Sequence, residues 1–363
     1  MEKKIGILTF HFPDNYGAVL QTYSLLRKIN SLGYDAEVID YVPGGNAGKN
    51  KVFVGLTGLK SLVSNMLRLL TLPFCLIRRN RFRAFRSNFI RTSERYLAPD
   101  DIPYERYGTV VTGSDQTFNR NYDFTDVYYQ PFVKSEGQTK VAYAPSLGSM
   151  SPALLDDASL DILKDFDHLS CREQDAADAL SEMLNREVSC VLDPVFLTDR
   201  EEWLKLTGKP CRRKPYVFVY DLNAKDKVVK IARQRYPHHD ILIYSNDPLG
   251  PVKMRGQGIH FTQSAGVEDF LTLICHSDAV VTDSFHGTAF SLIMEKDFYV
   301  YLSLEKAADR IISLLRYMGL EDRITCPGKD VKSSQLDYSV VRKRLGELIA
   351  RSESFLKEAL DER

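Results

Sequence analysis

The sequence predicts an α/β protein with two Rossmann-like domains whose parallel sheets face a cleft. Short apolar runs alternate with amphipathic helical stretches in two series, one before residue 205 and one after residue 212. The strand-like runs are almost continuously apolar, which is typical of parallel strands buried on both faces. A chain of 363 residues is also long enough for about two domains.

The composition is typical of a soluble, folded protein. Apolar residues make up 44% of the chain and charged residues 26%, and 48 basic side chains balance 48 acidic ones. Because the net charge is zero, the protein as a whole has no positive electrostatic field that would favour binding of nucleic acid. The six cysteines include no C-x-x-C pair, which argues against a disulfide scaffold or a structural zinc site. The N-terminal residues run directly into a strand-like segment without a signal-peptide pattern, so we expect a cytoplasmic protein.

The first domain, expected over residues 1–205, opens with a βαβ unit. Lys4–Phe10 predicts a buried strand, a helix follows through residue 29, and Gly33 ends that helix. Ala36–Tyr41 predicts the second strand. The remaining strands of this domain are expected at Gly108–Thr112, Lys140–Ala144, His168–Cys171 and Val188–Leu192.

The second domain is expected over residues 212–335, after a linker at Thr198–Lys214 that is rich in glycine, proline and basic residues. A long amphipathic helix is expected over residues 336–363, with Val341, Leu345, Leu348 and Phe355 on one face. Strands of the second domain are expected at Tyr216–Tyr220, Asp240–Tyr244, Asp278–Thr282 and Phe298–Tyr301. Helices are expected at Lys225–Tyr236, Glu268–Cys275 and Gly287–Met294.

A basic block interrupts the first domain. Between Tyr41 and Ser93 there is no acidic residue but there are ten basic ones, so the rest of the chain carries a formal charge of −10. Within the block, the apolar run Leu62–Ile77 is too short and too interrupted to span a membrane. Two interpretations stay open for residues 49–95: a helical hairpin with a solvated basic face, or a patch for an anionic membrane surface.

The strongest local motif is AVVTDSFHGTAFSLI, residues 279–293. A strand ends near Asp283 and a helix begins after Ser284, so Ser284, His286 and Gly287 lie at a helix N-terminus beyond a strand end. Such a position favours anions, and a histidine there can donate a proton to a reacting atom. A purely structural interpretation, with Ser284 or Asp283 as the N-cap, fits the same residues.

A second motif is SCRE, which places Arg172 at the end of a strand and Glu173 at the start of a helix. An arginine there suits bidentate capture of a phosphate or a carboxylate. An ion pair with Glu173 or Asp175 would explain the same residue without a ligand.

Two further loops carry polar side chains beyond strand ends. In VVTGSDQTFN, Asp115 suits a base or an acceptor for sugar hydroxyls, with Ser114 and Gln116 beside it, although capping is the more common role. The loop HFPDNYGA precedes the first helix and lacks G-x-G-x-x-G, which disfavours a dinucleotide site. From this loop we take His11, Asn15 and Gly17 as candidate acceptor-binding residues.

Taken together, the motifs resemble the polysaccharide pyruvyl transferase family. The resemblance covers most of the chain in order, through KIGILTFHFPDNYGAVLQ, VVTGSDQTFN, VAYAPSLG, SCRE, VLDPVFL, VVTDSFHGTAFSLI and DRIISLLRYMGLEDR. It implies a GT-B-like fold and the transfer of pyruvate from phosphoenolpyruvate to two sugar hydroxyls as a ketal. The expected setting is capsule, exopolysaccharide or cell-wall glycan biosynthesis. Two departures are Thr117–Phe118 in place of Val-Trp, and Ser284 where some members have a basic residue.

The resemblance also implies residue roles. His286 matches the catalytic histidine and Arg172 the arginine that helps to hold the donor. Ser284, Gly287 and Arg310 are further donor-binding candidates, although Arg310 also suits an exposed ion pair. Asp115 or Asp283 is expected to remove the hydroxyl proton, and Ser114 and Gln116 to bind the acceptor.

The expected partners are phosphoenolpyruvate and a glycan or lipid-linked oligosaccharide, with no cofactor, metal or nucleic acid. If the acceptor is lipid-linked, residues 49–91 are expected to hold the protein peripherally at the inner face of the membrane. Two other functions stay open: a GT-B-like sugar-nucleotide glycosyltransferase, since fold does not fix function, and a non-catalytic scaffold of a glycan pathway.

Overall fold

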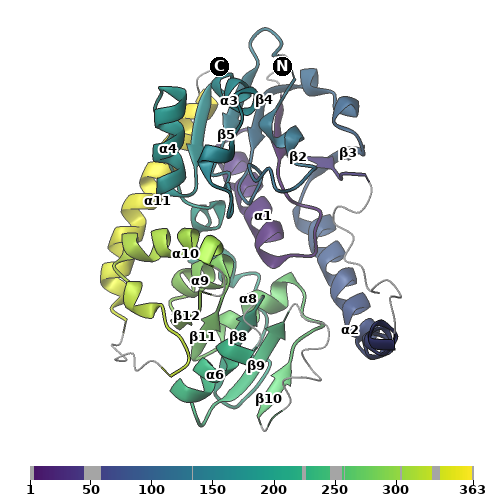
Figure 1. Cartoon of the computed structure of the whole chain (residues 1–363), viewed down its shortest axis with the longest axis vertical. Coiled ribbons are helices and arrows are strands. Elements are labelled where there is room, and N and C mark those ends of the chain that lie inside the picture. The colour runs from purple at the N-terminus through teal and green to yellow at the C-terminus, as the bar shows by residue number, and fades with distance from the viewer. Residues whose placement is uncertain are drawn as a thin grey trace. The chain divides into compact units, whose positions relative to one another are not determined.

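The computed structural model describes residues 4–44, 59–132, 134–222, 226–245, 256, 258–302, 305–328 and 336–361. The chain forms two compact units (Figure 1). Unit 1 comprises Met1–Gly48, Arg86–Asp199 and Arg342–Arg363, and unit 2 comprises Lys49–Phe85 and Arg200–Val341.

Unit 1 is built on a seven-stranded sheet in the order β3-β2-β1-β4-β5-β6-β7, with every pairing parallel. The chain builds outward from β1 in one direction through β2 and β3, and in the other from β4 through β7. The carboxyl ends of β1 and β4 therefore flank a topological switch point, where ligands bind in open parallel sheets. The strands are β1 (Lys4–Leu8), β2 (Ala36–Tyr41), β3 (Thr92–Tyr96), β4 (Tyr107–Thr112), β5 (Thr139–Ala142), β6 (His168–Cys171) and β7 (Ser189–Cys190).

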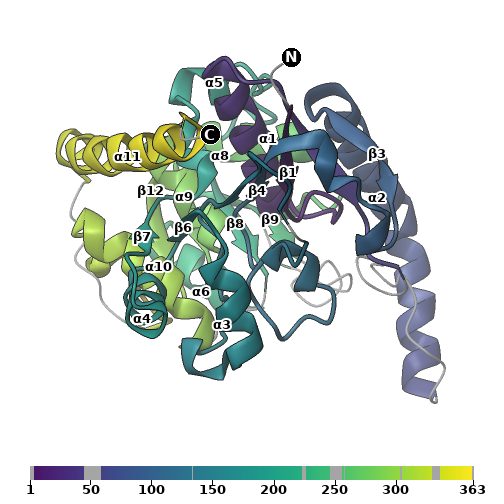
Figure 2. The same cartoon turned by 90° about the horizontal axis from the view of Figure 1, so that it is seen from above.

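Helices cover both faces of this sheet. Helix α1 (Tyr16–Ser31) and the C-terminal helix α11 (Tyr338–Asp361) lie on one side, and α3 (Asp157–Lys164) and α4 (Gln174–Leu184) on the other (Figure 2). This division follows from right-handed crossovers that leave the switch point in opposite directions. Short 3₁₀ turns occupy η1 (Pro99–Asp101), η2 (Tyr104–Arg106), η3 (Asp126–Tyr129), η4 (Pro152–Leu154) and η5 (Pro194–Leu197).

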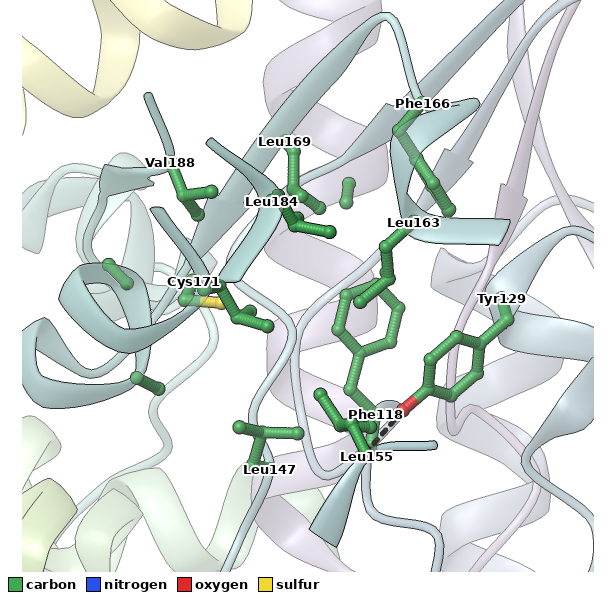
Figure 3. Close-up of a cluster of buried hydrophobic side chains, with 14 of the residues drawn as sticks. Phe118, Tyr129, Leu147, Leu155, Leu163, Phe166, Leu169, Cys171, Leu184 and Val188 are labelled. Carbon is green, nitrogen blue, oxygen red and sulfur yellow. Dashed lines mark hydrogen bonds between the residues drawn. The ribbon is translucent and has the colours of Figure 1, made fainter. Parts of the chain in front are cut away.

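The core beneath α3 and α4 fixes the loops that follow β4 and β5 (Figure 3). Phe118, from the loop after β4, is fully buried and stacks on Tyr129 with ring centroids 4.7 Å apart. The Tyr129 hydroxyl donates a hydrogen bond to the Phe118 carbonyl at 2.9 Å. The polar residues that precede Phe118 in this loop are thus attached to a rigid base.

Unit 2 contains a five-stranded parallel sheet in the order β10-β9-β8-β11-β12, whose switch point lies between β8 and β11. Its strands are β8 (Tyr216–Asp221), β9 (Asp240–Ser245), β10 (Ile259–Phe261), β11 (Ala279–Thr282) and β12 (Asp297–Val300). Its helices are α5 (Arg200–Leu204), α6 (Asp226–Arg235), α8 (Val267–Cys275), α9 (Phe285–Ile293) and α10 (Glu305–Met318), with a 3₁₀ turn η6 (Glu321–Arg323).

Aromatic side chains join the unit 2 sheet to α8, α9 and α5. The ring of Phe270 in α8 lies 5.0 Å from that of Tyr220 in β8 and 5.9 Å from that of Phe290 in α9. Phe290 in turn contacts the fully buried Trp203 of α5 at 5.1 Å. This layer holds α9, which carries the 279–293 motif, firmly against the sheet.

Both sheets are parallel and flanked by helices, which confirms the predicted α/β class with two Rossmann-like units. Most predicted strands match within about two residues. Two edge strands, β3 and β10, were not predicted. The sequence of β3 is TSERY and β10 has three residues, so neither gives an apolar run.

The basic block differs from the predicted hairpin. It contains a single helix, α2 (Leu59–Phe89), with Pro73 inside it. Residues 59–85 group with unit 2, and Arg81 in this stretch is paired with Asp269 of α8. The C-terminal helix was predicted as a separate segment, but residues from Arg342 onward group with unit 1. Lys49 and Lys51 of the basic block lie outside the described residues.

Candidate functional site

The 279–293 motif lies at the switch point of the unit 2 sheet. Strand β11 ends at Thr282, and Asp283 follows at the carboxyl edge. The Asp283 carboxylate accepts a hydrogen bond from the backbone N–H of Leu222, which follows β8, at 2.8 Å. Asp283 therefore joins the two loops that flank the switch point.

Ser284 caps helix α9. Its backbone is extended and its hydroxyl accepts from the Gly287 N–H at 3.4 Å, as the capping interpretation expected. Gly287 is required by close packing, since a Cβ there would lie 2.9 Å from Cβ of Thr282. The helix N-terminus thus packs directly against the end of β11, and its dipole favours negative charge at this edge.

His286 is the second residue of α9 and is 9% exposed. Its ring meets that of Phe285 edge-on, with centroids 5.2 Å apart. Arg310 lies in α10, which packs against α9, and is half-buried. The structure thus gathers Asp283, Ser284, His286 and Gly287 at one edge of unit 2.

Arg172 lies at the corresponding edge of unit 1, after β6, with its side chain only 2% exposed. Its guanidinium donates to Asp193 at 2.7 Å and to Glu173 at 3.3 Å. Burial lowers the pKa of Arg172, but the carboxylates of Glu173, Asp193 and Asp115 outweigh burial and raise it. The arginine is therefore a fixed positive charge among three negative ones.

Sequence reasoning identified Arg172 but missed Asp193. This carboxylate is completely buried and also accepts from the hydroxyl of Ser114 at 2.8 Å. The segment VLDPVFL contributes to the family resemblance, but the resemblance assigns no role to its aspartate. A fully buried aspartate at a strand end is a signal of a polar network, but its partners lie 21 and 79 residues away along the chain.

Asp115 and Gln116 form the half-exposed part of the loop after β4. Asp115 has φ +80°, a strained value for a residue other than glycine, and such strain gathers at functional sites. Its carboxylate accepts from the Gln116 N–H at 2.8 Å, while the Gln116 side chain accepts from Asn119 at 2.9 Å. Both side chains lie at the carboxyl edge of the sheet, near Ser114.

The loop after β1 places its predicted residues in structural roles. Asn15 is the N-cap of α1 and accepts from the Ala18 N–H at 3.2 Å, and Gly17 is buried in the first turn. His11 is buried, with Nδ1 3.1 Å from the Thr9 carbonyl and Nε2 2.9 Å from Asp40. Both ring nitrogens therefore lie within hydrogen-bond distance of an oxygen atom. Acceptor binding by these three residues stays a prediction.

Asp40, the partner of His11, makes the stability of the folded protein depend on pH. Burial raises the pKa of Asp40, but the hydrogen bonds and charges of His11 and Arg95 outweigh it and hold the pKa below its ordinary value of 3.8. The resulting stabilisation is present above that value and is lost as the pH falls through the folded-state pKa. We expect urea unfolding to show wild type more stable than Asp40→Asn at pH 6, with the difference shrinking below about pH 4. A difference that stays constant to pH 2 would contradict this.

The comparison with protein families decides the assignment. The model of the polysaccharide pyruvyl transferase family matches residues 15–303, which include every candidate site residue except His11 and Arg310. The chain belongs to the polysaccharide pyruvyl transferase family. This assigns it to the transferases of polysaccharide biosynthesis and confirms the family predicted from the motifs. No curated protein sequence matches the chain.

This pyruvyl transferase family member also resembles solved structures of low sequence identity. A Listeria monocytogenes protein assigned as a UDP-N-acetylglucosamine 2-epimerase is 9% identical with a TM-score of 0.53, covering 99% of this chain and 91% of that one. A Neisseria meningitidis UDP-GlcNAc 2-epimerase bound to UDP-GlcNAc is 10% identical with a TM-score of 0.49, covering 99% and 94%. The former supports the two-unit, GT-B-like architecture.

Proposed function

We propose that this family member transfers pyruvate from phosphoenolpyruvate to two hydroxyls of a sugar, forming a ketal. The observation that carries the proposal is the position of His286, in the first turn of α9 and at the switch point of unit 2. A proton donor beside a helix N-terminus suits a substrate that carries phosphate and carboxylate groups.

In this mechanism His286 is the general acid. It protonates the methylene carbon of the donor or assists departure of phosphate, and a sugar hydroxyl attacks the central carbon as its proton passes to a carboxylate. Asp115 and Asp283 are the candidates for that base. Loss of inorganic phosphate and attack by the second hydroxyl close the ketal. Of the two hydroxyl protons released, one balances the proton gained at the methylene carbon and the other leaves with the phosphate.

Donor binding is assigned to Ser284, Gly287 and Arg310 in unit 2. The support is that α9 presents its N-terminus at the sheet edge and that Arg310 lies in the neighbouring helix α10. Arg172 is the further donor-binding candidate from the family resemblance. Since Asp193 and Glu173 already hold its guanidinium, a donor would have to share the arginine with them.

The test is release of phosphate from phosphoenolpyruvate, with and without free and lipid-linked galactosyl or mannosyl acceptors. Acceptor-dependent release and a ketal in the product would support the proposal. Transfer from a UDP-sugar without consumption of phosphoenolpyruvate would instead indicate a glycosyltransferase. Calorimetry that detects no binding of phosphoenolpyruvate, with no turnover, would favour a scaffold.

We further propose that α2 contacts an anionic membrane surface, where a lipid-linked acceptor would lie. Among the described residues, no helix is sufficiently long and apolar to cross a bilayer. The solvent side of α2 nevertheless combines exposed Arg79 and Arg83 with large apolar side chains that are 44–53% exposed. This combination suits the interface of an anionic leaflet. The apolar residues are Leu69, Phe74, Leu76 and Ile77.

The structure separates the arginines of α2 into two kinds. Arg78 bonds to Tyr244 and Arg81 to Asp269, whereas Arg79 and Arg83 face solvent. We expect the double variant Arg79→Gln/Arg83→Gln to bind vesicles of phosphatidylglycerol and phosphatidylcholine about 30-fold more weakly, since it removes two charges at about 1 kcal/mol each. Cosedimentation measures this. The control Lys343→Gln/Lys357→Gln removes two exposed charges from α11 and should bind as wild type does. Equal binding of wild type to neutral vesicles would contradict the proposal.

A further inference from the structure

Glu173 has a buried oxygen for which the described part of the chain offers no hydrogen-bond partner. The residue follows β6 and immediately precedes α4, and its side chain is 9% exposed. One carboxylate oxygen, Oε1, accepts from Ser146 at 2.7 Å and from Arg172 at 3.3 Å. The other, Oε2, is buried and has no hydrogen-bond partner among the described residues. Buried polar atoms are nearly always paired, so this oxygen calls for a hydrogen-bond donor beyond the described residues, such as a bound ligand.

The surroundings of Glu173 restrict what that donor can be. Asp193 and Glu173 share the single guanidinium of Arg172, and Asp115 adds a third carboxylate nearby. Oε2 is itself a carboxylate oxygen with two further carboxylates nearby, so a phosphate or a carboxylate is a poor partner for this atom. A neutral group with a hydroxyl donor satisfies Oε2 without adding charge.

Contacts through Gly148 and Ser146 connect the half-exposed loop after β4 to the Glu173 carboxylate. Ser146, which donates to Glu173, also accepts from the Gly148 N–H at 2.9 Å. Gly148 has φ +65°, and a Cβ there would lie 2.6 Å from the side-chain amide of Asn119, which bonds to Gln116. The absence of a side chain at Gly148 lets the two loops approach, so that Gln116 and Glu173 belong to one continuous polar edge.

We propose that Oε2 of Glu173 accepts a hydrogen bond from a hydroxyl of the acceptor sugar, with Arg172 and Ser146 positioning the carboxylate. The inference rests on the proposed function, since it assigns the acceptor to this edge of unit 1. The proposal adds Glu173 to the predicted acceptor-binding residues. The side chain of Glu173 does not cap α4, and its ion pair with Arg172 leaves Oε2 unexplained.

The experiment compares wild type with Glu173→Gln, which keeps the size of the side chain and an oxygen for Ser146 but places an amide N–H₂ where an acceptor is needed. Binding of methyl β-galactoside and methyl α-mannoside is titrated by NMR without phosphoenolpyruvate. We expect Glu173→Gln to weaken binding of the preferred glycoside about 10–100-fold, as for a hydrogen bond to a charged group. The control is Asp175→Asn, an exposed carboxylate in the first turn of the same helix, which should bind as wild type does.

Stability and donor binding separate this role from a structural one. Because Asp193 still pairs with Arg172, Glu173→Gln should keep a thermal midpoint close to that of wild type and the wild-type calorimetric affinity for phosphoenolpyruvate. A lowered midpoint together with weaker binding of both substrates would overturn the proposal, and so would unchanged glycoside affinity, which would mean that Oε2 only holds water. Failure of wild type to bind either glycoside would also overturn it. Since binding is measured without turnover, absence of phosphate release would count against the proposed reaction alone.

Discussion

Replacing His286 with alanine is expected to reduce acceptor-dependent phosphate release from phosphoenolpyruvate by about 10²–10⁴-fold, the usual contribution of a general acid. The ring lies at the first turn of α9, and the aromatic layer beneath that helix does not depend on it. We therefore expect kcat to fall while the thermal midpoint stays close to that of wild type. Phosphate release measured with a coupled assay and thermal unfolding measured by circular dichroism check the two parts.

His238→Ala is the matched control, because His238 is an exposed histidine in a turn of the same unit. It should leave kcat and the midpoint unchanged. The role of His286 fails if His286→Ala turns over as fast as wild type. If phosphate release and thermal midpoint fall together, the loss reflects folding, and His286→Gln, which keeps a polar side chain of similar reach, then decides between the two causes.

Removing the guanidinium of Arg172 is expected to lower the free energy of unfolding by about 3–5 kcal/mol, as when one partner of a buried ion pair is removed. The side chains of Arg172 and Asp193 are 2% and 0% exposed, and Glu173 depends on the same cation. Arg172→Ala therefore leaves two buried carboxylates without their counter-charge. Urea unfolding at pH 7 measures the loss.

The double variant Arg172→Met/Asp193→Leu tests whether charge compensation is the cause. Replacing both partners with apolar side chains should restore part of the lost stability, although Glu173 and Ser114 lose partners. An alternative follows from the family resemblance, in which Arg172 binds the donor. That role predicts a raised KM for phosphoenolpyruvate and wild-type unfolding in urea, and this outcome would contradict compensation as the main role.

The fold was predictable where strands are buried on both faces. β1, β4, β8 and β11 are apolar runs whose residues are nearly all buried, and each was predicted. An edge strand such as β3 pairs with one strand only and is mostly exposed, so it needs no apolar run. Its sequence therefore gives little indication of a strand. The predicted hairpin was wrong, since residues 59–89 form one helix, α2, in which Pro73 lies on the exposed side.

The sequence predicted which loops form the candidate site, but not which side chains in them bond to one another. Polar clusters that follow apolar runs place Ser114, Arg172 and His286 at the carboxyl edges of parallel sheets. The partners that bond to such residues, as Asp193 does to Arg172 and Asp40 to His11, come from other strands or their ends. Such pairing depends on strand order, which a single sequence does not reveal.

The composition of unit 1 from three stretches of chain has a consequence for biosynthesis. Its last stretch supplies the fully buried Leu356 and Leu360, and the hydroxyl of Ser352 receives the Leu192 N–H at 2.9 Å. Unit 2 lies within residues 49–341. On the ribosome, the stretches that form unit 2 have therefore all emerged while the earlier-made strands of unit 1 still lack their final helix. The part of the enzyme that is translated first is thus the part that matures last.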